Sequence, residues 1–485
     1  MRPAPFAPAA RILAALGLFA AAAGAEIPDE GDCPRSGGRG AENTIEDATP
    51  TLVREGFAVE YSDLPRLREL IPAEVWSHRN VFFSSGMLME IGPCHRRYRV
   101  PAHFSDATER FAARAKLDAE GNLSGYVAGT PFPPESIADD DPAAGAKWAW
   151  NLEYRNREAG PRGHFRITDM PSRTGGIQIY TGEFFHLRTN HRADLVDSAF
   201  KQPGAENSLW IGGGRFDTPS EARHLAWRQM RSVSADHRFS KPDDTFVYAP
   251  ATRKVRRAAT AWVDGMYTPS YRVGQGWGGG SVATGSSGAA PAGAVSLSSA
   301  LSNAATEHLP VGFNDLSVRP NAYRWRLIGM REVLAPINGV RSGYPENPIR
   351  NFGTSGLALG SDRWEVRYAV LIEGKTRNRE QGFDTLLVYV DHQTHLPLFL
   401  ITRRERGLIV DIGISVHRFS GDVADYPSRP GADRALVFDP VAAVYYRAAD
   451  GGSGWRRESY DVNSSAPSRT ALREMTTTDT LLRGR

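Results

Sequence analysis

Long apolar runs are almost absent from this 485-residue sequence. The one exception, Ile12–Ala23, holds about 12 residues and is too short to cross a bilayer, which takes roughly 20. Arg2 and Arg11 precede this run, and the small residues Ala23-Gly24-Ala25 end it. A charged start, a short apolar region and a small-residue cleavage site predict a signal peptide over residues 1–25, and an uncleaved anchor is the alternative.

The residue that would follow cleavage is Glu26 and not the cysteine that a bacterial lipoprotein needs for its lipid anchor. Lysine is scarce, with six residues against abundant arginine, alanine and glycine, a composition typical of GC-rich bacterial genomes. We therefore expect a protein exported to the periplasm of a Gram-negative cell, soluble or peripherally associated with the outer membrane, and without a transmembrane segment in the mature chain. Residues 26–485 are expected to form a single domain.

Cysteine is nearly absent too, with only Cys33 and Cys94. An isolated pair in an oxidising compartment predicts a disulfide, and two free thiols are the alternative. A disulfide here would close a loop of about 60 residues and contribute roughly 3–4 kcal/mol.

Neither sign of charge dominates, because 58 Lys and Arg face 55 Asp and Glu and the two are interspersed. This argues against a nucleic-acid partner. Signatures of phosphate loops, dinucleotide sites, nucleophile elbows and zinc helices are missing, so no catalytic residues, cofactor or metal are predicted. His392 and His395 offer metal ligands, but they lie in an expected turn without a third ligand. His186 and His191 are interpreted as ordinary polar residues.

Strand patterns dominate from about residue 163. The clearest is Trp364–Ile372, where apolar and polar side chains alternate, so one face should pack on an apolar interior. Further strands are expected at Leu386–Val390, Leu398–Ile401 and Leu408–Val416, and a hairpin at Val247–Arg257. Before residue 163, Ser62, Pro72 and Ser105 are predicted to begin helices. The Gly/Ser/Ala-rich segment 274–303 is expected to be a flexible loop.

Aromatic and methionine side chains recur in the helices and middle strands. Plain core is one interpretation, and a cavity lined for a hydrophobic ligand is the other, since curved open sheets enclose apolar pockets and methionine adapts to varied shapes. The candidate cavity residues are Phe83, Met87, Trp227, Met230, Phe246, Trp262, Trp325, Trp364 and Tyr368.

Five motifs in order resemble a bacterial domain-of-unknown-function family whose members are often described as outer membrane lipoprotein-sorting proteins. They are Gly-x-Pro-Phe-Pro at 129–133, Trp-Asn-x-x-x-Arg at 150–155, the hairpin at 247–257, Trp-Arg-Leu-Ile-Gly-Met-Arg-Glu at 325–332 and Arg-Trp-Glu-Val at 363–366. The resemblance covers about residues 75–480. Segments 274–303 and 338–340 depart from the family pattern, so the resemblance implies no particular structure for these two loops.

The resemblance implies a fold similar to the lipoprotein carriers LolA and LolB: mainly β (α+β), with a strongly curved, incompletely closed antiparallel sheet, barrel-like, whose concave face is plugged by helices. It also implies a lipid or other hydrophobic ligand and a possible partner, either a resistance-nodulation-division type transporter or an outer-membrane protein. Two hypotheses follow, a carrier or chaperone for a hydrophobic ligand and a non-catalytic interaction subunit of an envelope transporter. An envelope hydrolase is a third, which no motif favours.

Overall fold

The computed structural model describes residues 27–34, 52–170, 177–250, 253–258, 271–272, 276–277, 318–340, 356–377, 383–427, 434–449 and 454–483. The predicted signal peptide, Trp262 and most of segment 274–303 lie outside the described residues.

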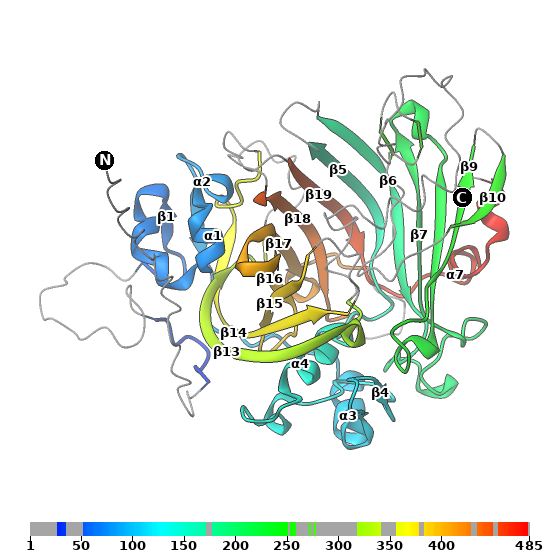
Figure 1. Ribbon diagram of the computed structural model, residues 1–485, viewed down its shortest axis with the longest axis horizontal. Coiled ribbons are helices and arrows are strands. Elements are labelled where there is room, and N and C mark those ends of the chain that lie inside the picture. The colour runs from blue at the N-terminus through cyan, green and yellow to red at the C-terminus, as the bar shows by residue number, and fades with distance from the viewer. Residues whose placement is uncertain are drawn as a thin grey trace, which may run out of the picture.

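One large sheet of 15 strands forms the body of the protein (Figure 1). Its strands are β1 (Ala58–Glu60), β2 (Leu88–Ile91), β5 (Arg162–Met170), β6 (Gln178–Arg188), β7 (Ser208–Thr218), β8 (Ala226–Ser232), β9 (Asp244–Ala249), β10 (Lys254–Ala258), β13 (Tyr323–Ala335), β14 (Arg363–Thr376), β15 (Thr385–Asp391), β16 (Pro397–Arg403), β17 (Ile409–Phe419), β18 (Phe438–Arg447) and β19 (Gly454–Asn463). Two small hairpins stand apart from it, β3 (Lys116–Leu117) with β4 (Leu123–Ser124), and β11 (Tyr271–Arg272) with β12 (Gly276–Trp277).

The sheet order is β1-β2-β14-β15-β16-β17-β18-β19-β5-β6-β7-β8-β9-β10, and β13 also pairs with β14. All pairings are antiparallel except that of β2 with β14. Within the described chain β10 does not pair with β13 or β1, so the sheet stays open. This confirms the predicted fold class, a mainly β protein built on an incompletely closed antiparallel sheet.

Helices cover both faces of the sheet. The α-helices are α1 (Ala73–Ser77), α2 (Arg79–Phe82), α3 (Ala102–Phe111), α4 (Ala144–Glu153) and α7 (Arg469–Thr476), and the longer 3₁₀ helices are η1 (Tyr61–Leu70) and η11 (Asp479–Arg483). On one face, α4 packs Trp148 and Leu152 against β13–β15. On the other face, η1, α1 and α2 cover β13–β17, and α7 covers β6–β8. Figure 1 shows α1 and α2 at one end of the molecule and α7 beside β7 at the other.

Two features of the local structure differ from what the sequence pattern alone would suggest. Ser105 does not cap a helix, because α3 begins earlier, after Pro101, whose fixed φ suits a helix start. The polar face of β14 is not exposed to solvent, since Glu365 is 0% and Arg367 2% exposed. Both side chains lie beneath the segment that follows Cys94, where carboxylates and hydrogen bonds satisfy their charges.

The predicted disulfide between Cys33 and Cys94 is confirmed. It holds residues 27–34 against the body, where the Gly31 amide also donates to the carbonyl of Cys94 at 2.8 Å. Among the described helices, none is long and apolar enough to span a membrane.

Candidate functional site

Two cavities of ligand size lie in the described structure. The first has a volume of about 560 Å³ and lies between the segment after Cys94, the middle of β14 and the turn that joins β15 to β16. The second has a volume of about 800 Å³ and lies between β5–β8, α7 and the segment 423–427. Pockets for small ligands measure roughly 300–1,000 Å³, so both are large enough for one.

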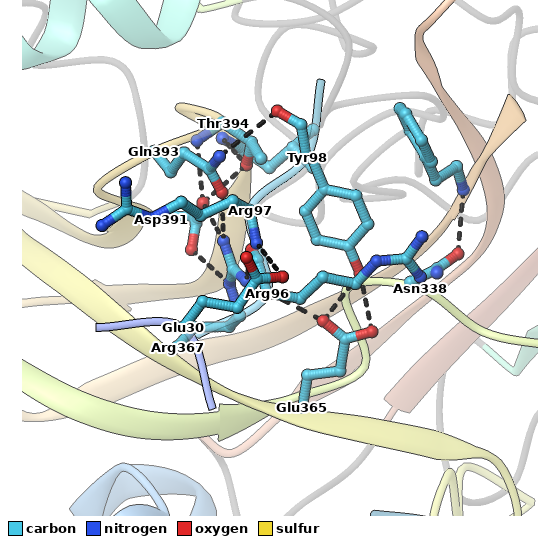
Figure 2. Close-up of polar contacts among 12 residues, drawn as sticks. Glu30, Arg96, Arg97, Tyr98, Asn338, Glu365, Arg367, Asp391, Gln393 and Thr394 are labelled. Carbon is cyan, nitrogen blue, oxygen red and sulfur yellow. Dashed lines mark hydrogen bonds and ion pairs between the residues drawn. The ribbon is translucent and has the colours of Figure 1, made fainter. Parts of the chain in front are cut away.

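Charged pairs build the wall of the first cavity (Figure 2). The hydroxyl of Tyr98 lies 2.6 Å from each carboxylate oxygen of Glu365 and donates to that carboxylate. Beside it, the Arg367 guanidinium donates to Asp391 at 2.8 and 3.1 Å and to the Arg96 carbonyl at 2.7 Å. These contacts fasten the segment after Cys94 to the sheet.

The pKa values in this wall follow from burial and from the nearest charge. Burial raises the pKa of Glu365 to about 6, although Arg367 and the Tyr98 hydrogen bond oppose the shift. Burial alone would also raise the pKa of Asp391, but the guanidinium of Arg367 reverses this and holds it below its usual value. The buried charged groups of the wall are therefore already paired with one another. A ligand would have to replace these hydrogen bonds and ion pairs in order to bind them.

The histidines singled out in the sequence are packed and not grouped around a metal. Burial lowers the pKa of His395 to about 3, and its ring lies 5.7 Å from that of Trp148. His392 lies 5.3 Å from the same indole. His191 is buried with its pKa lowered to about 4, and its Nδ1 lies 2.8 Å from the Val127 carbonyl. Over the described ranges, no three His, Cys, Asp or Glu side chains gather as metal ligands.

The second cavity is built on two rows of side chains that the strand register places side by side. The inner row runs across five strands, with each residue directly opposite the next: Asn463, Arg162, Phe185, Gly213 and Arg228. The outer row runs parallel to it through Asp461, His164, Glu183 and Arg215. Because alternate residues of a strand point to the same face, both rows face α7.

Glycine at position 213 makes room for the most buried charge in this cavity. A Cβ there would lie 2.6 Å from the Nη1 of Arg228 and 3.3 Å from the ring of Phe185. In its absence, the Arg228 guanidinium lies over the Phe185 ring, 4.8 Å from the ring centre. The side chain is only 3% exposed.

Arg228 is poorly compensated for a buried cation. Its Nη2 donates to two neutral oxygens, the carbonyl of Glu474 and the hydroxyl of Thr480, each at 3.1 Å. Its Nε is buried without a hydrogen-bond partner in the described structure. Burial lowers the pKa of Arg228 to about 10, with Glu474 opposing the shift, so the group still carries its charge at neutral pH.

The rest of the lining of the second cavity consists of apolar side chains and exposed carboxylates. Apolar contacts come from Phe185, Val423, Tyr426, Ala471 and Met475. The carboxylates of Asp425, Asp461 and Glu474 belong to exposed residues at the rim. At the outer row, Arg215 lies 3.3 Å from Glu183, and both are partly exposed. The cavity thus has an acidic and solvated rim, an apolar wall and a buried guanidinium.

The residues predicted to line a cavity, as far as the structure describes them, lie in several separate clusters and not around one cavity. Phe83, Met87 and Trp364 are buried in the core beneath η1, α1 and α2. Trp325 packs with α4, Trp227 lies in the core of β5–β8 on the face opposite α7, and Phe246 is partly buried on β9.

Two of the set lie nearer to the cavities. Tyr368 lines the first cavity, and Met230 packs beside Phe185 in the cluster under α7. As a binding site the predicted set stays a prediction. Sequence reasoning missed the Arg228 row, although three consecutive glycines at 212–214 inside a strand signal a close approach of neighbouring side chains.

Comparisons with known proteins agree with the resemblance found in the sequence. The model of a protein family of unknown function (DUF1329) matches residues 80–272, which confirms that resemblance. No curated protein matches the chain.

Three solved structures are similar at low identity. A Vibrio parahaemolyticus outer membrane lipoprotein-sorting protein domain is 11% identical with a TM-score of 0.37, covering 71% of this chain and 100% of its own. A DUF1329 family protein from Desulfovibrio piger is 12% identical with a TM-score of 0.39, covering 70% and 99%. A LolA superfamily protein from Nitrosomonas europaea is 9% identical with a TM-score of 0.32, covering 69% and 96%.

Proposed function

We propose that this protein is a periplasmic carrier or chaperone that binds a lipid or other hydrophobic ligand in the second cavity. The observation that supports this most is the cavity itself, about 800 Å³ with apolar side chains on its wall and on the helix that covers it. The export signal expected from the sequence and the match to the DUF1329 family support the same role. The role needs no catalytic residue, and we propose none.

The covering helix is suited to admitting a ligand. Helix α7 contributes Ala471, Glu474 and Met475 to the lining. It spans eight residues, Arg469–Thr476, and none of its described side chains is fully buried. Short, shallowly packed elements open at lower cost than core strands, so the ligand would enter beneath α7.

Apolar burial gives an affinity adequate for a carrier. A chain of about 12 carbons gains about 0.8 kcal/mol for each buried CH₂, or about 10 kcal/mol in all. Lost translational and rotational freedom and ordering of the chain cost about 4 kcal/mol or more. The remainder corresponds to a Kd of roughly tens of micromolar, which allows both capture and release.

The test combines native mass spectrometry with a variant that fills the cavity. Protein purified from its own periplasm under native conditions should retain a mass increment that organic solvent extracts. Ala471→Trp places an indole into the cavity from α7 and should abolish binding of dodecanol, whereas Arg473→Trp puts the same indole on the exposed side of α7 and should leave binding unchanged. Equal binding by both variants would place the ligand elsewhere or refute the carrier.

For delivery, we propose a partner in the envelope, either a transporter of the resistance-nodulation-division type or an outer-membrane protein. The family resemblance supports this partner. The alternative role, an interaction subunit without cargo, predicts a contiguous apolar docking patch. The large exposed apolar side chains of the described structure, from which such a patch would be built, are Ile27, Leu88, Val100, Ile177, Ile179, Val196, Ile328, Val340 and Leu408. Crosslinking in the periplasm with and without the Ala471→Trp substitution separates the roles, because only a carrier needs an open cavity.

A further inference from the structure

The second cavity carries a charge that a purely apolar ligand would leave unused. Arg228 lies at its inner row, 3% exposed, and the hydrogen bonds of its Nη2 go to neutral oxygens. Burial of a cation is costly unless a counter-charge lies nearby. We infer that the ligand is an anionic amphiphile whose phosphate or carboxylate head is held at Arg228 and whose hydrocarbon tail lies along Phe185 and Met475. This inference rests on the carrier function proposed above.

The position of Arg228 separates it from the other charges around the cavity. The carboxylates that line the cavity belong mostly to exposed residues, whereas Arg228 lies behind the Phe185 ring, where solvent screens it little. Arg215, in the outer row, already has Glu183 at 3.3 Å. An anion that passes the rim therefore meets Arg228, a buried cation whose Nε has no hydrogen-bond partner among the described residues.

Two further arginines extend the positive side of the cavity. Arg162 stands in the same row as Arg228, on the other side of Phe185, and donates to the backbone and side chain of Ser465. Arg418 of β17 also lines the cavity and is partly buried. A phosphate has three oxygens able to accept hydrogen bonds, and guanidinium groups are the donors that match that geometry.

The apolar wall fixes the direction of the tail. Phe185, Met475 and Leu472 form one cluster under α7. Val423 and Tyr426 line the cavity farther along, from segment 423–427. A tail that starts at Arg228 would therefore run under α7. Different parts of one site would then bind the head and the tail.

The test compares ligands that differ only in the head. Dodecyl phosphate, dodecanol and inorganic phosphate are titrated by calorimetry into the full-length mature protein below the micelle concentration. Charge-assisted hydrogen bonds predict that dodecyl phosphate binds about 10-fold or more tighter than dodecanol, and that inorganic phosphate alone binds far more weakly than either. If inorganic phosphate binds as tightly as dodecyl phosphate, the inference of an amphiphilic ligand is wrong and the cavity is a site for a free anion.

Substitution of the arginine locates the head. Arg228→Met keeps an unbranched side chain over Phe185 and should reduce the affinity for dodecyl phosphate to that for dodecanol. Arg473→Met, on the exposed side of α7, removes one positive charge outside the cavity and should keep the preference. If Arg228→Met does not fold, the preference of the unaltered protein for phosphate over alcohol remains decisive.

The outcomes separate this inference from the proposed function. Equal binding of dodecanol and dodecyl phosphate refutes the anionic head and leaves the carrier intact. Binding of neither amphiphile refutes the carrier and this inference with it. A preference that survives Arg228→Met shows that another group holds the head and refutes the assignment to Arg228.

Discussion

The disulfide between Cys33 and Cys94 is predicted to contribute much of its effect through the unfolded chain. The two residues are 61 positions apart. Closing a loop of that length in the unfolded state removes conformational entropy worth about 4 kcal/mol at 25 °C. The perturbation that removes the bond with least damage is Cys33→Ala, because Cys94 is buried in the core and Cys33 is only partly buried against it.

The folded state also gains conformational entropy when the bond is lost, because residues 27–34 become free to move. This gain offsets part of the entropy that the unfolded chain recovers. Apart from the disulfide, the contacts of residues 27–34 with the body include three weak ones. The Gly31 amide donates to the Cys94 carbonyl, the Arg97 amide donates to Glu30 at 3.1 Å, and Arg97 forms an exposed ion pair with Asp29 at 3.2 Å. Exposed pairs are worth about 1 kcal/mol or less each, whereas ordering one residue costs about 1–2 kcal/mol. The segment should therefore detach, and we expect a net loss of about 2–4 kcal/mol.

The assay is urea denaturation of the mature protein, followed by circular dichroism, with and without a thiol reductant. Cys33→Ala in reductant should match the reduced native sequence, and the Cys33→Ala/Cys94→Ala variant should not respond to reductant. Limited proteolysis should remove the N-terminal segment from the variants and not from the oxidised protein. A loss below 1 kcal/mol, or protection of the segment after reduction, would refute the reasoning.

Two further predictions concern buried carboxylates. Asp243 is buried between Arg231 and Arg319, at 3.1 and 2.5 Å, so Asp243→Ala should cost about 3–5 kcal/mol in urea unfolding, and a loss under 1 kcal/mol would contradict the bridge. Burial raises the pKa of Asp411 to about 7 from 3.8, so the folded state holds this proton more tightly than the unfolded state. Its contribution to stability is present below pH 4 and lost as the pH rises to 7, at about 1.4 kcal/mol per pH unit. Asp411→Asn should flatten that part of the curve measured from pH 4 to 8, and an unchanged slope would refute it.

Strands with regular alternation were predictable from the sequence, and strands that break the pattern were not. The alternation in Trp364–Ile372 identified β14, and the hairpin motif identified β9 and β10. β7 escaped prediction because Gly212–Gly214 interrupts it, and glycine in a strand usually signals a bend or an end. Here side chains of neighbouring strands occupy the space beside the glycines. Arg228 and Phe185 lie against Gly213 on one face, and Trp227 lies against Gly214 on the other.

β19 escaped prediction for a different reason, because its buried face contains charge. Glu458 is 0% exposed in the middle of this strand, and it accepts a hydrogen bond from Tyr460. A carboxylate at such a position predicts a solvent-facing surface when only the sequence is read. The core helix α4 was equally hidden, since its aromatic residues are buried on several sides and leave no single apolar stripe.

The candidate site could not be read from the sequence, because register and not composition assembles it. Arg162, Phe185 and Arg228 come from three strands and face one another only through the pairings of β5 to β8. Large apolar residues were the natural choice for a ligand cavity. Most of them fill the sheet core instead, where packing at crystal-like density leaves no room for a ligand.

Charge pairing distinguishes the two cavities better than size does. In the first, the buried guanidinium of Arg367 has the Asp391 carboxylate in two hydrogen bonds, and Glu365 has Tyr98. Breaking such pairs leaves a buried charge uncompensated, so this wall resists a ligand and is better suited to holding the segment after Cys94 on the sheet. In the second, the Nε of Arg228 is buried beside an apolar wall and has no hydrogen-bond partner in the part of the chain that the structure describes. An anion bound there would compensate this buried charge more fully than Glu474 does, which makes the second cavity the one whose chemistry a ligand completes.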